Sequence, residues 1–162
     1  MSPPNPRALS DEQALRLDNQ LCFALYSTSL TMTKLYKPVL ERLGLTYPQY
    51  LVMLVLWESS PLTVSELGAR LFLDSGTLTP LLKRLQAAGW LLRERDATDE
   101  RRVLISPSDA GRALRRKAAK VPREMAAATG CSVAALADLT RRLQTLRRHM
   151  AAIPLSPSDL AA

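Results

Sequence analysis

The chain has 162 residues, and its 22 Lys and Arg against 15 Asp and Glu leave a formal net charge of +7. This length is enough for one domain with appended helices, and this charge favours a polyanionic partner, either nucleic acid or an anionic membrane. Because the longest apolar run, Tyr50–Trp57, is too short to span a bilayer, we expect no membrane partner.

The N-terminal segment predicts a tail followed by helices. Residues 1–10, MSPPNPRALS, are rich in proline and lack the apolar core of a secretory signal, so we expect a flexible tail on a cytoplasmic protein. From about Asp11 to Tyr36 the chain lacks Gly and Pro and has apolar residues at helical spacing. We expect Pro38 to end or kink this helical run.

Two capping boxes mark the starts of further helices. Thr46 and Gln49 open an almost entirely apolar helix that runs to about Glu58, and a helix that is apolar on all sides is buried. Thr63 and Glu66 form the second box, in which a hydroxyl satisfies a backbone donor and the Glu reciprocates. The second box predicts a short helix at the start of a helix-turn-helix.

The next helix and a hairpin complete a winged helix-turn-helix. Asp74 or Ser75 is placed to cap this helix, and Gly89 has the position of a C-terminal stop. Its apolar stripe consists of Leu78, Leu81, Leu82 and Leu85. The segments WLLRER and RRVLI, separated by the turn-rich DATDE, predict two strands. The expected fold class is therefore mainly α with a small β-hairpin.

The opposite face of this helix suits the major groove of DNA. Small residues there alternate with hydroxyls and cations, so Ser or Thr can reach bases and Lys or Arg can reach phosphates. Arginines of the hairpin are expected to enter the minor groove, where the negative potential is strongest. The predicted DNA-binding residues are Ser75, Thr77, Thr79, Lys83, Arg84, Arg95, Arg101 and Arg102.

Two other interpretations of this region stay open. Pro80 removes a helical hydrogen bond unless it lies in the first turn, which would move the effective helix start to Thr77 or Thr79. An ordinary globular helical hairpin is the alternative to a DNA-binding one. A merely solvated face, however, more often carries long side chains of mixed charge.

The C-terminal segment predicts helices that pair with a second copy. Ser108 is placed to cap a helix that is disrupted near Pro122, and Gly130 separates it from a last helix over about 132–150. The last helix has a heptad-like seam, from which we expect a homodimer, formed by Leu136, Leu139, Leu143, Leu146 and Met150. A solvated helix face is favoured over contact with flanking DNA for the cations here, Arg112, Arg115, Arg116, Lys117, Lys120, Arg123, Arg141, Arg142, Arg147 and Arg148.

These patterns divide the chain into five parts. We expect a flexible tail (1–10), N-terminal helices for dimerisation and sensing (11–44), a winged helix-turn-helix DNA-binding domain (45–107), C-terminal dimerisation helices (108–152) and a second flexible tail (153–162). A dimer suits DNA binding, because two winged helices then face two half-sites at a set separation.

The chemistry of the chain, if it has any, lies with its cysteines. Neither a zinc-ligand pattern nor a phosphate-binding loop nor a hydrolytic triad occurs, so we expect no metal, no cofactor and no enzyme. One face of the first helix carries Cys22, Tyr26, Ser29, Thr33 and Tyr36. Asp18, one turn before Cys22, disfavours the thiolate, and no cation lies one turn away. Activation of Cys22 must come from tertiary neighbours, and an inert buried cysteine is the alternative.

Several stretches resemble the MarR family and, within it, the organic-hydroperoxide-sensing repressors known as OhrR. They are LCFALYS, LTYPQYLVMLVLWE, FLDSGTLTPLLKR and DERRVLI, and the resemblance extends over residues 18–111. It implies a homodimeric winged-helix repressor of a detoxifying peroxidase gene. It further implies that Cys22 is the peroxidatic thiol, that Tyr36 and Tyr47 hydrogen-bond it across the dimer interface, and that Tyr26 lines the pocket.

The resemblance extends to the second cysteine and to the hairpin. It implies that Cys131 is the resolving cysteine of a two-cysteine branch and forms an intersubunit disulfide with Cys22. It also implies that Arg101 is the minor-groove arginine. The chain departs from the family where the second strand usually leads into Leu-Thr, because Pro107 here removes a backbone donor at the strand-to-helix corner.

The resulting hypothesis is a repressor that leaves its operator DNA when an organic hydroperoxide oxidises Cys22. A MarR-type repressor released by a non-covalent phenolic ligand would use the same pocket without needing the thiol. A Cys-based thiol peroxidase would consume peroxide catalytically. A nucleoid protein would bind all DNA alike with a steep salt dependence.

Overall fold

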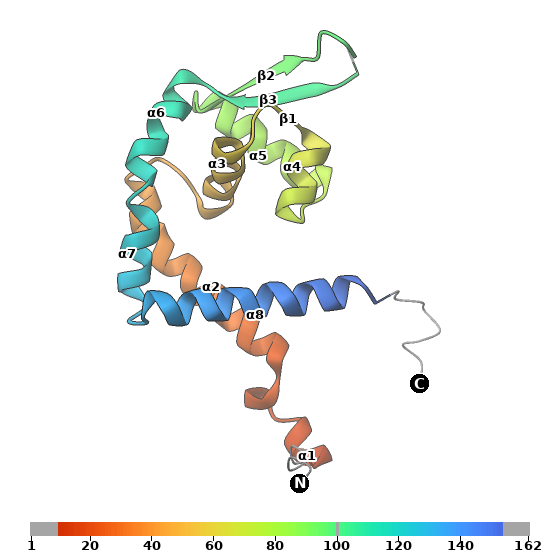
Figure 1. Cartoon of the computed structure of the whole chain (residues 1–162), viewed down its shortest axis with the longest axis vertical. Helices are drawn as coiled ribbons and strands as arrows, with labels where there is room; N and C mark the ends of the chain where they lie inside the picture. Colours follow the sequence, from red (N-terminus) through yellow and green to blue (C-terminus); the bar gives the residue numbers. More distant parts are fainter. Residues whose placement is uncertain (1–9, 100, 154–162) are drawn as a thin grey trace. The chain divides into compact units, whose positions relative to one another are not determined.

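The computed structural model describes residues 10–99 and 101–153. Apart from Ser10 and Ile153, the two predicted tails therefore lie outside the described residues. The chain forms two compact units, one that ends at Ala119 and one that begins at Lys120. The first is mainly helical around a small antiparallel sheet, which confirms the predicted fold class (Figure 1). No helix in the described ranges is long and apolar enough to cross a membrane.

The N-terminal helical run is divided into three pieces. They are α1 (Asp11–Ala14), the 3-10 helix η1 (Leu17–Asn19) and α2 (Leu21–Glu41). The single helix predicted from about residue 11 is therefore wrong before α2. The backbone is extended at Arg16 and Gln20, and the side-chain amide of Asn19 donates to the carbonyl of Gln13 at 2.7 Å. Polar side chains here take backbone partners that a continuous helix would need.

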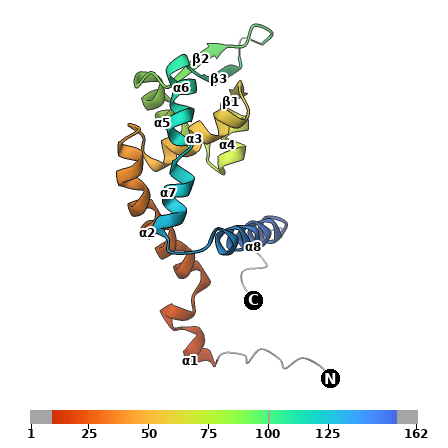
Figure 2. The same ribbon diagram turned by 60° about the vertical axis from the view of Figure 1, so that its left-hand side comes forward.

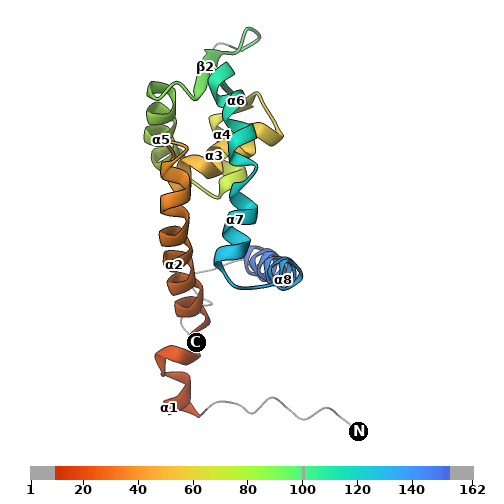
Figure 3. The same ribbon diagram turned by 90° about the vertical axis from the view of Figure 1, so that its left-hand side faces the viewer.

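Helix α2 is one uninterrupted helix past its proline (Figure 3). Pro38 lies inside α2, so the expectation that it ends the helix is wrong. A proline at this position leaves the carbonyl of Lys34 without its helical donor. Both residues are exposed, so water can bind that carbonyl, and the helix continues for three more residues to Glu41.

The apolar helix α3 (Tyr47–Glu58) forms the centre of the first unit. Its capping box is present as predicted, and the backbone N–H of Thr46 donates to Oε1 of Gln49 at 2.8 Å. The residues buried along it are Tyr50, Val52, Met53, Val55 and Leu56, which confirms that this helix is buried. At its end the indole of Trp57 donates to the carbonyl of Gly111 at 2.9 Å and joins α3 to the helix that follows the hairpin.

The hairpin belongs to a three-stranded sheet with the order β1-β3-β2. Strands β2 (Leu91–Arg95) and β3 (Val103–Pro107) confirm the two predicted strands and pair antiparallel from Leu91 with Pro107 to Arg95 with Val103. The sequence did not predict β1 (Leu62–Thr63), since two residues are too few for an alternating pattern. Helices α3, α4 (Val64–Leu71) and α5 (Ser75–Ala87) pack against this sheet, and the loop between β2 and β3 projects past them (Figure 2).

Helix α4 (Val64–Leu71) and helix α5 (Ser75–Ala87) form the helix-turn-helix. The capping box of α4 is confirmed, because the N–H of Glu66 donates to Thr63 Oγ1 and the carboxylate of Glu66 accepts from the N–H of Thr63. The turn between the helices is tight. A Cβ added at Gly68 would lie 2.7 Å from the carbonyl oxygen of Leu73, so the turn requires glycine.

The limits of α5 correct one expectation and confirm another. Asp74 caps the helix by accepting from the N–H of Thr77 at 2.9 Å, and the helix begins at Ser75. The expected start at Thr77 or Thr79 is therefore wrong, and Pro80 lies inside the helix. The carbonyl that loses its donor belongs to the exposed Gly76, where solvent can replace it. Gly89, with φ of 79°, terminates α5 as predicted.

The corner between β3 and α6 (Asp109–Ala118) forms despite Pro107. The hydroxyl of Ser108 accepts from the N–H of Gly111 at 3.0 Å and donates to the carbonyl of Gly89 at 2.5 Å. Its backbone N–H donates to the carbonyl of Trp90 at 3.1 Å. A Cβ at Gly111 would lie 2.0 Å from that same carbonyl oxygen, so this close approach requires glycine.

The second unit contains α7 (Val121–Ala128) and α8 (Val133–Ala151). The disruption predicted near Pro122 is confirmed, since α6 ends at Ala118 and the proline lies in the first turn of α7. Gly130, with φ of 67°, separates α7 from α8. Ser132 caps α8 by accepting from the N–H of Ala135 at 3.2 Å.

Candidate functional site

Helix α5 presents a polar face opposite its buried leucines. Leu78, Leu82 and Leu85 are fully buried in the first unit. The predicted DNA-binding residues on the other face are exposed at Ser75, Thr77, Lys83 and Arg84 and half-buried at Thr79. The helix therefore presents hydroxyls near its N-terminus and two cations farther along, and the major groove accepts a helix with this arrangement.

One of these hydroxyls already has a partner. Thr77 Oγ1 donates to Oδ2 of Asp74 at 2.8 Å, in addition to the backbone bond that caps the helix. Hydrogen bonds from the N–H and then the hydroxyl of Thr77 lower the pKa of Asp74. The hydroxyl oxygen of Thr77 keeps its lone pairs, so toward DNA it is an acceptor and suits the amino groups of adenine or cytosine.

The hairpin formed by β2, β3 and the loop between them, here called the wing, carries the three predicted arginines. Asp96 accepts from the hydroxyl of Thr98 at 2.7 Å and from its N–H at 2.9 Å, and these two bonds lower the pKa of Asp96. Arg102 lies 3.8 Å from the same carboxylate. Arg101 donates its backbone N–H to Asp99, and its exposed guanidinium has no ion pair among the residues that the structure describes. Arg95, at the end of β2, is also exposed.

A cleft of about 340 Å³ lies between the wing and the start of α4. It is lined by Thr63, Val64, Ser65, Arg101, Arg102 and Val103. The sequence analysis did not connect these segments, which lie more than 35 residues apart, because only the pairing of β1 with β3 brings them together. This cleft has positive potential, because it is lined by the start of α4 and by Arg101 and Arg102.

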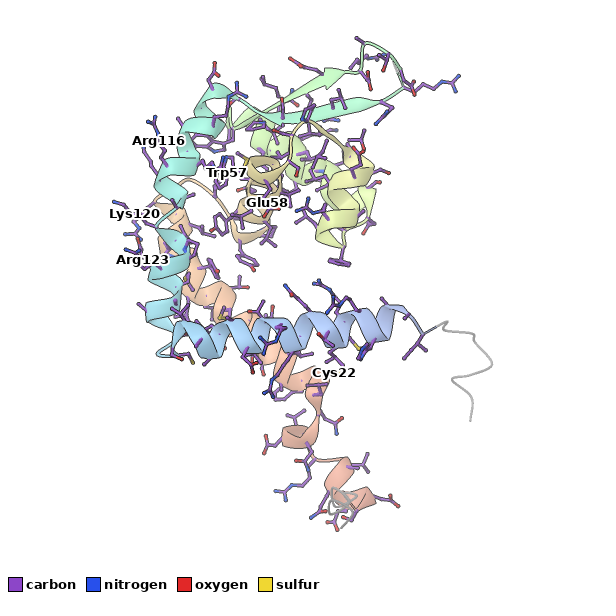
Figure 4. The ribbon with its side chains drawn as sticks, viewed as in Figure 1. Cys22, Trp57, Glu58, Arg116, Lys120 and Arg123 are labelled. Carbon is purple, nitrogen blue, oxygen red and sulfur yellow. The ribbon has the colours of Figure 1, made fainter. Side chains whose placement is uncertain are left out.

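Both cysteines are free of a disulfide and exposed. Cys22 lies in the first turn of α2 (Figure 4), and Cys131 lies between α7 and α8. The alternative of an inert buried cysteine is therefore not what the structure shows for Cys22. Tyr26, one turn after Cys22, is 62% exposed. The N–H of Cys131 donates to the hydroxyl of Thr129 at 3.3 Å.

The tyrosines implied by the resemblance form a cluster at the other end of α2. The ring centroids of Tyr36 and Tyr47 are 4.8 Å apart, and those of Tyr36 and Tyr50 are 6.1 Å apart. Burial raises the pKa of Tyr36 and Tyr47, and burial followed by the two neighbouring phenols raises the pKa of Tyr50 to about 12. All three phenols are therefore protonated donors at neutral pH.

The sequence analysis missed Tyr50. It is only 3% exposed and packs behind Tyr36. The available signal was the spacing of three residues between Tyr47 and Tyr50, which places both on one side of α3. That spacing was obscured because the residues that follow Tyr50 on α3, from Leu51 to Trp57, are all apolar.

Cys22 cannot meet the tyrosine cluster of its own chain. Fourteen residues of one continuous helix separate Cys22 from Tyr36, a length of about 21 Å at the rise of an α-helix. A thiol hydrogen bond requires its partner within about 3.5 Å. If the phenols contact a Cys22 thiol, that thiol belongs to a second copy.

A groove of about 320 Å³ adjoins the tyrosine cluster. Its walls come from the second half of α2 and the start of α3, and they consist of Thr33, Lys34, Lys37, Glu41, Leu45, Thr46, Tyr47 and Pro48. Lys37 pairs with Glu41 at 3.9 Å, with both side chains exposed. Within the described ranges, no group of three or more His, Cys, Asp and Glu residues is arranged to hold a metal ion.

Comparisons with known proteins show the family of this chain. The profile of the family described as "Transcriptional regulator SarA/Rot" matches residues 34–117. The "Organic hydroperoxide resistance transcriptional regulator" of Bacillus subtilis (strain 168) is 48% identical over 132 residues, which cover 82% of this chain and 90% of that protein. Among solved structures, "Structure of reduced AbfR bound to DNA" has a TM-score of 0.70 and 35% identity and covers 87% of this chain and 99% of that one.

A second structure of the same relative records a different redox state. "Structure of Disulfide formed AbfR" has a TM-score of 0.57 and 38% identity, and covers 83% of this chain and 95% of that one. AbfR is a protein of Staphylococcus epidermidis. These relatives are named as regulators or were solved with DNA.

Proposed function

Because this chain belongs to the MarR-like SarA/Rot family of transcriptional regulators, we propose that it is a repressor that leaves its operator DNA when an organic hydroperoxide oxidises Cys22. The observation that carries the proposal is the contact between the phenol rings of Tyr36 on α2 and Tyr47 on α3, about 21 Å along α2 from the exposed thiol of Cys22. The name of the Bacillus subtilis relative supports the chemical class of the inducer.

The DNA-reading part of the proposal rests on α5 and the wing. We expect Ser75, Thr77 and Thr79 to contact bases in the major groove, and Lys83 and Arg84 to contact phosphates. We expect Arg95, Arg101 and Arg102 to contact the flanking backbone and the minor groove. The AbfR structures solved with DNA support a duplex as the partner.

The sensing part requires a homodimer, in which residues 11–44 and 108–152 pair with a second copy. The helical distance of about 21 Å keeps Cys22 from the phenols of its own chain, so the phenols of one subunit serve the thiol of the other. Two phenolic donors stabilise a thiolate and hold it in an apolar surrounding that an organic hydroperoxide can enter. Tyr26, one turn from Cys22, forms part of the same pocket.

The oxidation proceeds in two balanced steps. The Cys22 thiolate attacks the terminal peroxide oxygen, an S–O bond forms, the O–O bond breaks, and the alkoxide leaves as an alcohol after taking up a proton. Sulfur loses two electrons and the peroxide gains them. The Cys131 thiol of the other subunit then attacks the sulfenic sulfur, forming a disulfide and releasing water.

This disulfide couples the thiol to DNA through the dimer helices. A disulfide holds the two Cα atoms within about 7 Å of each other. Its formation therefore brings Cys22 of one subunit and Cys131 of the other together, and with them the helices on which the dimer is proposed to depend. The two winged helices then lose the separation that fits consecutive grooves. A coupling free energy of about 1–3 kcal/mol corresponds to weaker DNA binding by roughly tenfold or more.

The test is a gel shift with a DNA fragment selected from a random pool by the reduced protein. We expect cumene hydroperoxide to release wild-type protein and to leave Cys22→Ser bound, with a crosslinked dimer on non-reducing electrophoresis that Cys131→Ser does not form. Release of Cys22→Ser at the wild-type dose would contradict the proposal. Release by salicylate without oxidant would instead indicate a non-covalent ligand, and turnover of peroxide with dithiothreitol would indicate a thiol peroxidase.

A further inference from the structure

The groove beside the tyrosine cluster holds a cation without an ion pair. Lys34 and Lys37 both line it, but Lys37 pairs with Glu41. Lys34 is exposed and forms no ion pair within the part of the chain that the structure describes. Thr33 and Tyr47 line the same groove, so Lys34 borders one of the two phenols proposed to bind the thiol, that of Tyr47.

The segment that must enter this groove brings negative charge. Asp18 lies in η1, one turn before Cys22, and both are exposed. Placing a carboxylate and a thiolate near the same cluster is costly, because like charges disfavour one another. The phenols are neutral donors and supply no positive charge. No Lys, Arg or His of the sequence lies one turn before or after Cys22.

We propose that Lys34 of one subunit is the cation that neutralises Asp18 and stabilises the Cys22 thiolate of a second copy of this chain. This inference rests on the proposed function and adds a residue to its sensing pocket. The charged and titratable groups that face the thiol are then Lys34, Lys37 and Glu41 from α2 of the other subunit, together with the phenols of Tyr36 and Tyr47. From its own chain the thiol faces Asp18.

Charge and apolar character both favour a second copy of this chain as the occupant of the groove. The groove surface is mostly apolar and includes two lysines. The start of α2 is apolar as well and follows a segment of opposite charge. It exposes Leu21, Phe23, Tyr26 and Leu30. The segment before it, residues 11–20, carries Asp11, Glu12 and Asp18 against one cation, Arg16. Lys37 is a weaker candidate for the cation because Glu41 already offsets its charge.

Lys34 acts as a positioning and electrostatic residue, since it leaves the hydroperoxide chemistry to Cys22. A cation near a thiolate raises the fraction of ionised thiol at a given pH. The effect is moderated by solvent, because Lys34 is exposed in the isolated chain. Arginine in place of Lys34 would keep the charge, while glutamine would keep the length and remove it.

The experiment measures the rate at which iodoacetamide alkylates Cys22 as a function of pH. It uses the full, reduced chain carrying Cys131→Ser, so that one thiol reports. In this background we expect Lys34→Gln to move the midpoint of the pH profile upward by about 0.5–1 unit and to slow alkylation at pH 7 about three- to tenfold. Lys34→Arg is expected to retain the original midpoint.

The control is Arg93→Gln, which removes a cation on β2, outside the segments proposed to pair and outside the proposed DNA contacts, and should leave the midpoint unchanged. A midpoint in Lys34→Gln equal to that of the parent overturns the inference, and so does an equal shift in Arg93→Gln. If sedimentation shows that Lys34→Gln no longer dimerises, Asp18→Asn is added to it. Recovery of the dimer by the double variant supports the cross-subunit pairing, and failure to recover it overturns the inference.

The same preparations separate this inference from the proposed function. If hydroperoxide releases wild-type protein from DNA and Lys34→Gln alkylates like its parent, only the role of Lys34 is wrong. If hydroperoxide releases Cys22→Ser from DNA, the proposed function is wrong whatever the alkylation profile shows.

Discussion

The winged helix and the start of α2 differ in how much of their apolar surface the chain itself covers. In the winged helix, Leu67, Leu78, Leu82 and Leu85 are fully buried. At the start of α2, Leu21, Phe23, Tyr26 and Leu30 are all exposed. Large apolar side chains exposed close together on a monomer are typical of an interaction surface. Under the proposed function, one subunit would therefore complete the DNA-binding surface by itself, whereas the start of α2 would need a second copy.

The largest expected effect contrasts two leucines. Leu82→Ala removes a fully buried side chain from the winged helix, and we expect it to lower the free energy of unfolding by about 2–5 kcal/mol. Leu30→Ala alters a side chain that is 47% exposed, and we expect it to weaken self-association instead. Thermal unfolding and sedimentation measure the two effects. If both variants lost the dimer equally and unfolded at the same temperature, the expected difference between the winged helix and the start of α2 would be contradicted.

A smaller effect is expected at the wing. Arg101→Ala removes a guanidinium that has no ion pair among the described residues, so the folded state loses little. If this group enters the minor groove, binding to the selected DNA should weaken by about 1–3 kcal/mol, and the slope of affinity against salt should become shallower. Arg116→Ala on α6 is the control for a general loss of charge. The same loss of affinity in both variants would argue against a specific contact of Arg101.

The smallest effect concerns pH. Hydrogen bonds from the backbone and hydroxyl of Thr63, and then the charge of Arg102, lower the pKa of Glu66 from its usual 4.5. A lowered pKa in the folded state stabilises the protein above the unfolded value and loses that contribution as pH falls through the folded value. We therefore expect Glu66→Gln, which can still cap α4, to make unfolding slightly less sensitive to acid below about pH 4.5. An unchanged acid profile in chemical denaturation would contradict this expectation.

Local signals in the sequence were sufficient for most of the helix limits. The capping boxes at Thr46 and Thr63 and the left-handed stop at Gly89 predicted helix ends that the structure confirms. These signals succeed because each involves residues that are three or four positions apart. The errors arose at Pro38 and Pro80. At each proline one carbonyl loses its helical hydrogen-bond donor, but it belongs to an exposed residue, so water can replace the donor and the helix continues.

The sites depended on distant contacts to different degrees. Cys22 and Tyr36 could be placed on one helix from their spacing, and the resemblance supplied their expected roles. The tyrosine cluster with Tyr50 could not be placed in that way, because it forms only where α2 crosses the start of α3. The cleft between Ser65 and the wing likewise needs β1 to pair with β3.

The sequence by itself determined the winged helix-turn-helix, the polar face of α5 and the presence of a thiol on the first long helix, because periodicity and capping are local. Only the tertiary structure decided that the thiol is exposed and that Tyr36, about 21 Å along the same helix, lies against the phenols of α3. It also decided that Lys34 borders their groove. A rigid helix sets this separation, and no local pattern records which groups meet at its far end.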